Sequence, residues 1–254
     1  MIPKHYSPSQ ISSFISYRSE YIAGRVLGDP FQTNAHMQRG FGVEEGIEQI
    51  ICHKKSLAEA VEAGLRKYDD GCRELTDRAG VEKWRSVIAD SIKHGAQEFL
   101  EYGTAGSFKP QNKISTKLDG SKVEIIGYTD FELPEVVYDL KSTSRTPSGI
   151  SDAYKIQGAI YNLATGKKVV FVFVIPLKTG VKVKAIPMTE SDISYGIELA
   201  NCAVAAMDDF WSSVPAIMTE THRKIFRSLA FPDICGMYKS EEKRAALARL
   251  SISK

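Results

Sequence analysis

The sequence predicts an α/β protein in which a mixed central sheet is flanked by helices and preceded by an N-terminal helical region. Apolar residues recur at helical spacing over about the first hundred positions. After Gly103 the spacing changes to the alternation typical of strands, interrupted by a further helical segment. With 254 residues, 43% of them hydrophobic, the chain is long enough for one well-packed domain. We therefore expect a single domain with a mainly helical region at 1–103, a sheet core at 104–188 and C-terminal helices at 189–254.

The N-terminal region predicts a series of amphipathic helices. Ser7 precedes Pro8 and an apolar stripe, which is the pattern of a capped helix with proline in its first turn. The segment Gly28-Asp29-Pro30 ends this helix, since glycine and proline both interrupt helical structure. The expected helices span about 8–23, 39–53, 57–68 and 81–102.

The alternating part of the chain predicts a β-hairpin, a helical crossover and a second hairpin. Asp119-Gly120 separates two alternating runs and is a strong turn signal. A later run, 169–175, is apolar enough to be buried on both faces. The expected strands span 113–118, 123–131, 135–142, 169–175 and 181–186, with helices at 151–164 and 189–214.

Two opposite charges stand at the end of the apolar strand expected at 135–142. Side chains alternate between the faces of a strand, so Asp139 and Lys141 share one face while Leu140 lies on the other. Charges in a buried strand are costly unless they are paired or bound to an ion. A structural ion pair and a functional site are therefore competing interpretations of this pair.

Composition excludes several classes of protein and leaves nucleic-acid binding open. The formal net charge of +2 and pI of about 8.2 do not by themselves indicate a nucleic-acid partner. The four cysteines form no Cys-x-x-Cys pair, which argues against a zinc ribbon and favours reduced thiols in the cytoplasm of a cell or of a virus-infected host cell. We expect no membrane partner, because neither a secretory leader nor an apolar run of about 18 residues is present.

Three short motifs occur in order along the expected core: Gly127-Tyr128-Thr129-Asp130, Asp139-Leu140-Lys141 and Gln157 to Tyr161. With the order of helix, three strands, helix and strand, they resemble the RecB-like exonuclease branch of the PD-(D/E)XK nuclease superfamily over about residues 7–188. The resemblance implies a restriction-endonuclease-like core.

The start of the first helix extends this resemblance to one group within the branch. The segment Ser7 to Ile11 is similar to the helix opening of CRISPR-associated members, which carry an iron–sulfur cluster. Tyr17 stands where those members have their first cysteine, and only Cys235 remains near the C-terminus. We therefore expect no iron–sulfur cluster, because ligation normally requires four thiolates.

The resemblance implies a metal centre for phosphodiester hydrolysis. Asp130, Asp139 and the backbone carbonyl of Leu140 are the expected ligands of Mg²⁺ or Mn²⁺, which prefer oxygen. The branch commonly has a histidine four residues after an early glycine, where this chain has Glu44. Glu44 is thus a further expected ligand, with Glu45 and Glu48 as alternatives if the register differs.

The remaining site residues are expected to position groups or to contact nucleic acid. Lys141 would orient or help to deprotonate the attacking water, while Gln157 and Tyr161, four residues apart, share a helical face beside it. Alternatively, Gln157 and Tyr161 belong to a helix face that only packs on the sheet. The expected DNA contacts are Tyr154, Ser142, Thr143, Arg145 and Arg18, with Arg25 and Arg39 as further candidates by position. The loop at 142–149 is equally well interpreted as an ordinary solvent-exposed loop.

The expected function is a metal-dependent DNA exonuclease acting on single- or double-stranded ends, in recombination, repair, replication or host-DNA degradation. The alternatives are an endonuclease on the same core and a catalytically inactive DNA-binding protein. No Walker-type phosphate loop is present, so a motor would have to come from another chain, and recombination or replication proteins are possible partners. The sequence predicts no oligomeric state.

Overall fold

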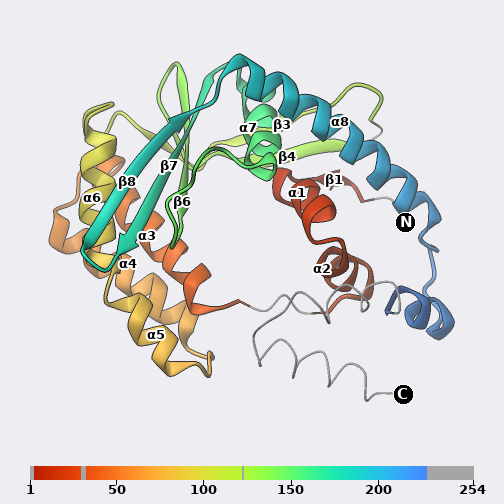
Figure 1. The fold of residues 1–254 in the computed structure, drawn as a ribbon, viewed down its shortest axis with the longest axis horizontal. Helices are drawn as coiled ribbons and strands as arrows, with labels where there is room; N and C mark the ends of the chain where they lie inside the picture. The colour runs from red at the N-terminus through yellow and green to blue at the C-terminus, as the bar shows by residue number, and fades with distance from the viewer. Residues whose placement is uncertain (1–2, 30–32, 122, 228–254) are drawn as a thin grey trace.

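The computed structural model of the chain describes residues 3–29, 33–121 and 123–227. Two β-sheets lie at its centre with helices packed around them, as Figure 1 shows. Both sheets mix parallel and antiparallel neighbours, which confirms the predicted α/β fold class. The predicted C-terminal helices fall partly on residues 228–254, which lie outside the described residues.

The N-terminal region forms a broken helix instead of the continuous one predicted over 8–23. Helix α1 (Pro8–Ser16) begins with a capping box in which the Ser7 and Gln10 side chains each bond to the other's backbone N–H. Tyr17 ends α1 because its backbone, at φ −143° and ψ 53°, is not helical. The chain then continues as α2 (Arg18–Ile22) and a π-helical turn, η1 (Ala23–Leu27).

The remaining N-terminal helices confirm the predicted helical region, with one correction. The helices are α3 (Ala35–Ile51), α4 (Leu57–Cys72), α5 (Arg78–Arg85) and α6 (Ile88–Leu100). The helix predicted over 81–102 is thus two helices. The break lies at Ser86, whose hydroxyl bonds to the Lys83 carbonyl and so competes with continued helix formation.

The first hairpin forms as predicted but its second strand is shorter. Strands β3 (Lys113–Thr116) and β4 (Glu124–Tyr128) pair antiparallel. The strand predicted over 123–131 ends at Tyr128, because the chain leaves this sheet and enters the other as β5 (Phe131–Glu132). Two short strands that the sequence did not predict, β1 (His5–Tyr6) and β2 (Lys109–Pro110), complete the edges.

The larger sheet has the order β2-β5-β6-β7-β8. Strand β6 (Val136–Ser142) runs parallel to β7 (Lys168–Leu177) through helix α7 (Asp152–Thr165). Strand β8 (Gly180–Pro187) forms the predicted hairpin with β7, and α8 (Glu190–Ser213) follows. Helices α1, α7 and α8 cover one face, where Val137 is buried, and α3, α4 and α6 cover the other, where Leu140 is buried (Figure 1).

Over the described residues, the structure contains no helix with the length and apolar character that crossing a membrane requires. Three of the four cysteines, Cys52, Cys72 and Cys202, are free thiols, and Cys235 lies outside the described residues. The absence of an iron–sulfur cluster and the single-domain organisation stay predictions.

Helices α3 and α4 approach each other through paired glycines. A Cβ atom placed on Gly42 would lie 2.7 Å from the Gly64 carbonyl oxygen, and one on Gly64 would lie 2.5 Å from the Gly42 carbonyl oxygen. Backbone oxygens cannot rotate away as flexible side chains can. The close approach therefore fixes the position of α3, the helix that carries Glu44.

We expect Gly64→Ala to lower the free energy of unfolding by about 1–3 kcal/mol, because the added methyl forces the helices apart. Urea denaturation measures this change. Gly149→Ala is the matched control, since nothing lies within 4 Å of its added Cβ and stability should be unchanged or slightly higher. Equal stability of the two variants would contradict the tight α3–α4 contact.

Candidate active site

The charge pair predicted at the end of the central strand is present in β6. The Lys141 Nζ atom lies 2.5 Å from Asp139 Oδ2, so the two side chains share one face as the strand alternation predicts. Asp139 is completely buried, whereas the Lys141 side chain keeps 20% of its surface exposed. Beyond this contact with Lys141, Asp139 Oδ2 has no hydrogen-bond partner among the described residues. A buried carboxylate oxygen is thus held beside a cation with bonding capacity left.

Asp130 lies between the two sheets, in the turn that joins β4 to β5. Its Oδ2 atom accepts a hydrogen bond of 2.7 Å from the Leu140 backbone N–H, which places it beside the middle of the Asp139-Leu140-Lys141 motif. The turn is held by the buried Glu132, which accepts hydrogen bonds from Thr129 Oγ1 at 2.7 Å and Lys167 Nζ at 2.6 Å. Asp130 therefore sits at a fixed kink in the chain.

Glu44 approaches the two aspartates from α3, on the other side of the sheet. Its Oε1 accepts a long hydrogen bond of 3.4 Å from Gln111 Nε2. The two alternative glutamates have other partners: Glu45 accepts from Gln49 and Glu48 contacts His53. The pKa of Glu44 responds to Asp139 and Lys141.

The electrostatics of the cluster are dominated by burial and by repulsion between carboxylates. Burial, and after it Asp139, raises the pKa of Glu44, and burial followed by Asp139 and Glu44 raises the pKa of Asp130. Burial lowers the pKa of Lys141, but Asp139 and Asp130 outweigh it and raise that pKa overall. Lys141 is therefore a protonated cation in this arrangement, which favours an orienting role over proton abstraction.

Helix α7 contributes the third motif by a short chain of hydrogen bonds. Gln157 Nε2 donates to Asp139 Oδ1 at 3.0 Å and to the Tyr161 hydroxyl at 2.7 Å. That hydroxyl donates to the Tyr128 carbonyl at 2.8 Å, and burial raises the pKa of Tyr161, so it keeps its proton. The three motifs predicted from the sequence thus meet around Asp139.

The predicted DNA-contact residues divide between the site and the surface. The Tyr154 ring stacks on Phe171 and lies 5.1 Å from Lys141 Nζ, so it forms a wall beside the lysine. The Arg18 guanidinium packs on the Phe14 ring, at 4.7 Å, in α1–α2. The remaining three lie at the end of β6 and on the loop that follows it. Ser142, the last residue of β6, bonds to Arg39, Thr143 bonds to the Arg145 backbone, and Arg145 is exposed.

The oxygen atoms of the cluster are of the kind that a hard divalent cation binds. Within residues 3–29, 33–121 and 123–227, no group of three or more His, Cys, Asp or Glu side chains is arranged to hold a metal ion. In this arrangement Asp130 accepts a hydrogen bond from the Leu140 N–H and Asp139 pairs with Lys141. The repulsion between the carboxylates, and the buried Asp139 Oδ2 whose contact is the Lys141 ammonium, fit a cation, because oxygen ligands of this kind are those Mg²⁺ and Mn²⁺ prefer.

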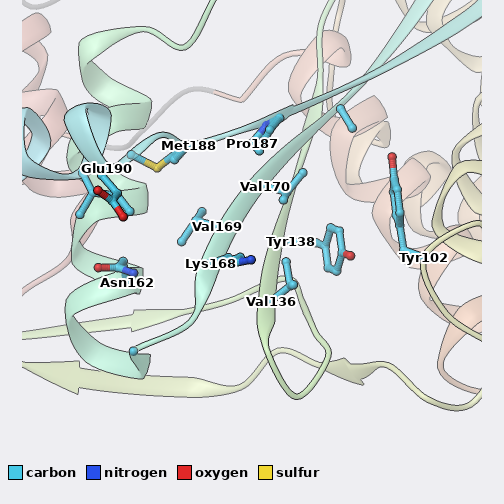
Figure 2. Close-up of a pocket in the computed structure, with 13 residues that line it drawn as sticks. Tyr102, Val136, Tyr138, Asn162, Lys168, Val169, Val170, Pro187, Met188 and Glu190 are labelled. Carbon is cyan, nitrogen blue, oxygen red and sulfur yellow. The ribbon is translucent and has the colours of Figure 1, made fainter.

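A pocket of about 520 Å³ lies at the opposite end of the same strands, as Figure 2 shows. Val136 and Lys168, at the starts of β6 and β7, line it together with Tyr138 and Tyr102. Neither aspartate nor Lys141 takes part in its lining. The charge cluster is therefore a site on the other end of the sheet and not a feature of this cavity.

Sequence patterns did not identify every residue that shapes the site. Glu132 and Lys167, 35 positions apart, carry no motif, and only the fold reveals their ion pair. Gln111, which contacts Glu44, was missed for the same reason. Arg39 was a candidate by position alone, and its contact with Ser142 links two distant segments.

No protein-family model matches the sequence, and no curated protein does. Among solved structures, the chain is similar to a candidate exonuclease from Eubacterium rectale, with a TM-score of 0.60 and 14% identity over 87% of this chain and 88% of that one. An alkaline exonuclease from Laribacter hongkongensis aligns over 89% of this chain and 94% of its own at 12% identity, with a TM-score of 0.42. The first comparison shows a shared fold, and the second is too distant to add to it.

We expect Asp130→Asn to raise the stability of the metal-free protein at pH 7. A carboxyl whose native pKa is raised destabilises the fold when it is ionised. The native protein therefore gains stability as pH falls from 7 towards 5, and the variant should gain less. Urea denaturation in chelator at both pH values measures this difference.

The exposed turn residue Asp119, changed to Asn, is the control and should leave the pH dependence unaltered. A less stable Asp130→Asn variant at pH 7 would show that the Asp130 charge is already compensated in the native protein.

Proposed function

We propose that this protein is a metal-dependent DNA exonuclease. The observation that supports the proposal most strongly is the buried Asp139–Lys141 pair at the end of β6, linked to Asp130 through the Leu140 N–H and to α7 through Gln157. A purely structural ion pair would not require a second aspartate and a glutamate directed at the same point, because like charges there cost stability.

The proposed metal site consists of Asp130, Asp139 and the Leu140 carbonyl, with Glu44 as a further ligand. Bound Mg²⁺ or Mn²⁺ would supply Lewis acidity and a water of lowered pKa for phosphodiester hydrolysis. Its charge would also compensate the repulsion that raises the pKa values of Glu44 and Asp130. No iron–sulfur cluster is part of the proposal.

The protein's own groups then position the reactants. Lys141, protonated and partly exposed, offers a positive charge to the scissile phosphate and a donor that orients the attacking water. The Tyr154 and Phe171 rings pack beside the lysine and shield that side of it from bulk water. Gln157, itself held by Tyr161, fixes the orientation of the Asp139 carboxylate.

Two observations favour DNA as the substrate and exonuclease cleavage as the activity. The motifs resemble the RecB-like branch, and the fold is shared with the candidate exonuclease from Eubacterium rectale. The exposed Arg145 and the hydroxyl of Thr143 lie on the loop that follows the lysine. They are the proposed contacts to the DNA backbone, and Arg18 is a further proposed contact to the same DNA strand. A role in recombination, repair, replication or host-DNA degradation in the cytoplasm is proposed on the resemblance alone.

We expect Asp139→Asn and Lys141→Ala each to lower the rate of DNA hydrolysis by at least about a hundredfold, because each removes charge at the reacting phosphate. Release of nucleotides from end-labelled single- and double-stranded DNA with Mg²⁺ or Mn²⁺ measures the rate. Asp119→Asn and Lys178→Ala, on exposed turns, are matched controls that should retain the parent rate.

The same assay separates the alternatives. Cleavage of a closed circular DNA as fast as a linear one would indicate an endonuclease. DNA binding without cleavage in either metal would indicate a catalytically inactive binding protein. Full activity in both Asp139→Asn and Lys141→Ala would remove the proposed active site.

A further inference from the structure

Arg39 is a fully buried arginine in α3, at the end of β6 that carries the active-site candidates. Its Nε atom donates a 3.0 Å hydrogen bond to the hydroxyl of Ser142, the residue that follows Lys141. Its guanidinium carbon lies 4.3 Å from the centre of the Trp84 ring, which supports one face of the group. The guanidinium is thus held against the last residue of the catalytic strand.

No carboxylate neutralises this cation within the described part of the chain. Arg39 forms no ion pair there, and its Nη1 atom is buried without a hydrogen-bond partner. Burial lowers the pKa of Arg39 to about 10, and the group that opposes this shift is the Tyr68 phenol and not a carboxylate. An unpaired buried charge is among the costliest features of a fold, so its presence calls for a partner beyond the described residues.

The groups around Arg39 suit an anion that carries several oxygen atoms. Arg39 Nη2 lies 3.3 Å from His36 Nε2, which accepts a hydrogen bond because a guanidinium can only donate, so the imidazole N–H is on Nδ1. The Ser142 hydroxyl accepts from Arg39 and keeps its own hydrogen to donate. His36, Gly40 and Ser142 are each partly exposed, so the guanidinium lies beneath an accessible rim.

We propose that Arg39, His36 and Ser142 form a phosphate-binding subsite beside the catalytic centre. This inference rests on the proposed function, because it assigns the subsite to a backbone phosphate of the DNA strand next to the scissile one. Arginine suits this ligand, since its planar fork matches two phosphate oxygens. Nη1, which is buried without a hydrogen-bond partner, is the guanidinium donor left for the phosphate, while the Ser142 hydroxyl and His36 Nδ1 supply further donors.

The structural alternative is that Arg39 only ties α3 to β6 and to Trp84. The two interpretations differ in what happens when the charge is removed. A structural tie predicts a large loss of stability and no response to phosphate. A phosphate subsite predicts a response to phosphate that depends on the guanidinium and on the Ser142 hydroxyl.

Thermal denaturation in chelator, with and without inorganic phosphate at constant ionic strength, tests the subsite without requiring cleavage. We expect phosphate to raise the melting temperature of the parent protein and of Arg66→Met by the same amount. The rise should be smaller in Ser142→Ala and absent in Arg39→Met. Arg66 is the matched control because it is an exposed arginine paired with Glu62. Arg39→Met should also bind single-stranded DNA about tenfold more weakly, with a shallower salt dependence.

Equal phosphate responses in the parent and Arg39→Met would overturn the subsite. If Arg39→Met does not fold, Arg39→Lys and Ser142→Ala decide by the same criterion, and an undiminished response in both overturns it. DNA cleavage is measured in parallel. If phosphate binding depends on Arg39 but the protein does not cleave DNA, the proposed function alone is rejected. If the protein cleaves DNA but Arg39→Met responds to phosphate as the parent does, the subsite alone is rejected.

Discussion

The arrangement of the site depends on one buried carboxylate, Asp139, at the end of the central strand β6. Its neighbours are a lysine at 2.5 Å and a glutamine at 3.0 Å, and two further carboxyl groups are close enough to feel its charge. Burial and the repulsion between carboxylates both make such a cluster of charges unfavourable. The surrounding fold must therefore hold each member in place, and a local cost of this kind is typical of functional sites.

Three independent elements provide that support. The α3–α4 contact through Gly42 and Gly64 fixes the position of α3, the helix that carries Glu44. The ion pair between Glu132 and Lys167 holds the turn that carries Asp130. Helix α7 brings Gln157 to the Asp139 carboxylate. Because each acidic residue comes from a different element, the cluster can persist only while the two sheets and their helices keep their packing.

Much of this arrangement was predictable from local sequence patterns. Strand alternation placed Asp139 and Lys141 on one face, and the four-residue spacing placed Gln157 and Tyr161 on one helical face. Breaks in regular structure were not predictable, because the apolar period continues through Tyr17 and Ser86 while the backbone does not. Contacts between distant segments, such as Arg39 with Ser142, carry no sequence signal at all. The metal ligands themselves stay predictions from chemistry and resemblance.

The central claim is that the carboxylate cluster binds a divalent cation between Asp130 and Asp139. Diffraction at the manganese absorption edge, from crystals grown with Mn²⁺, tests it most directly. The proposal predicts an anomalous peak bounded by these two carboxylates and the Leu140 carbonyl, with Lys141 displaced from Asp139 Oδ2. Crystals at saturating Mn²⁺ without a peak there, and with the Asp139–Lys141 contact intact, would contradict it.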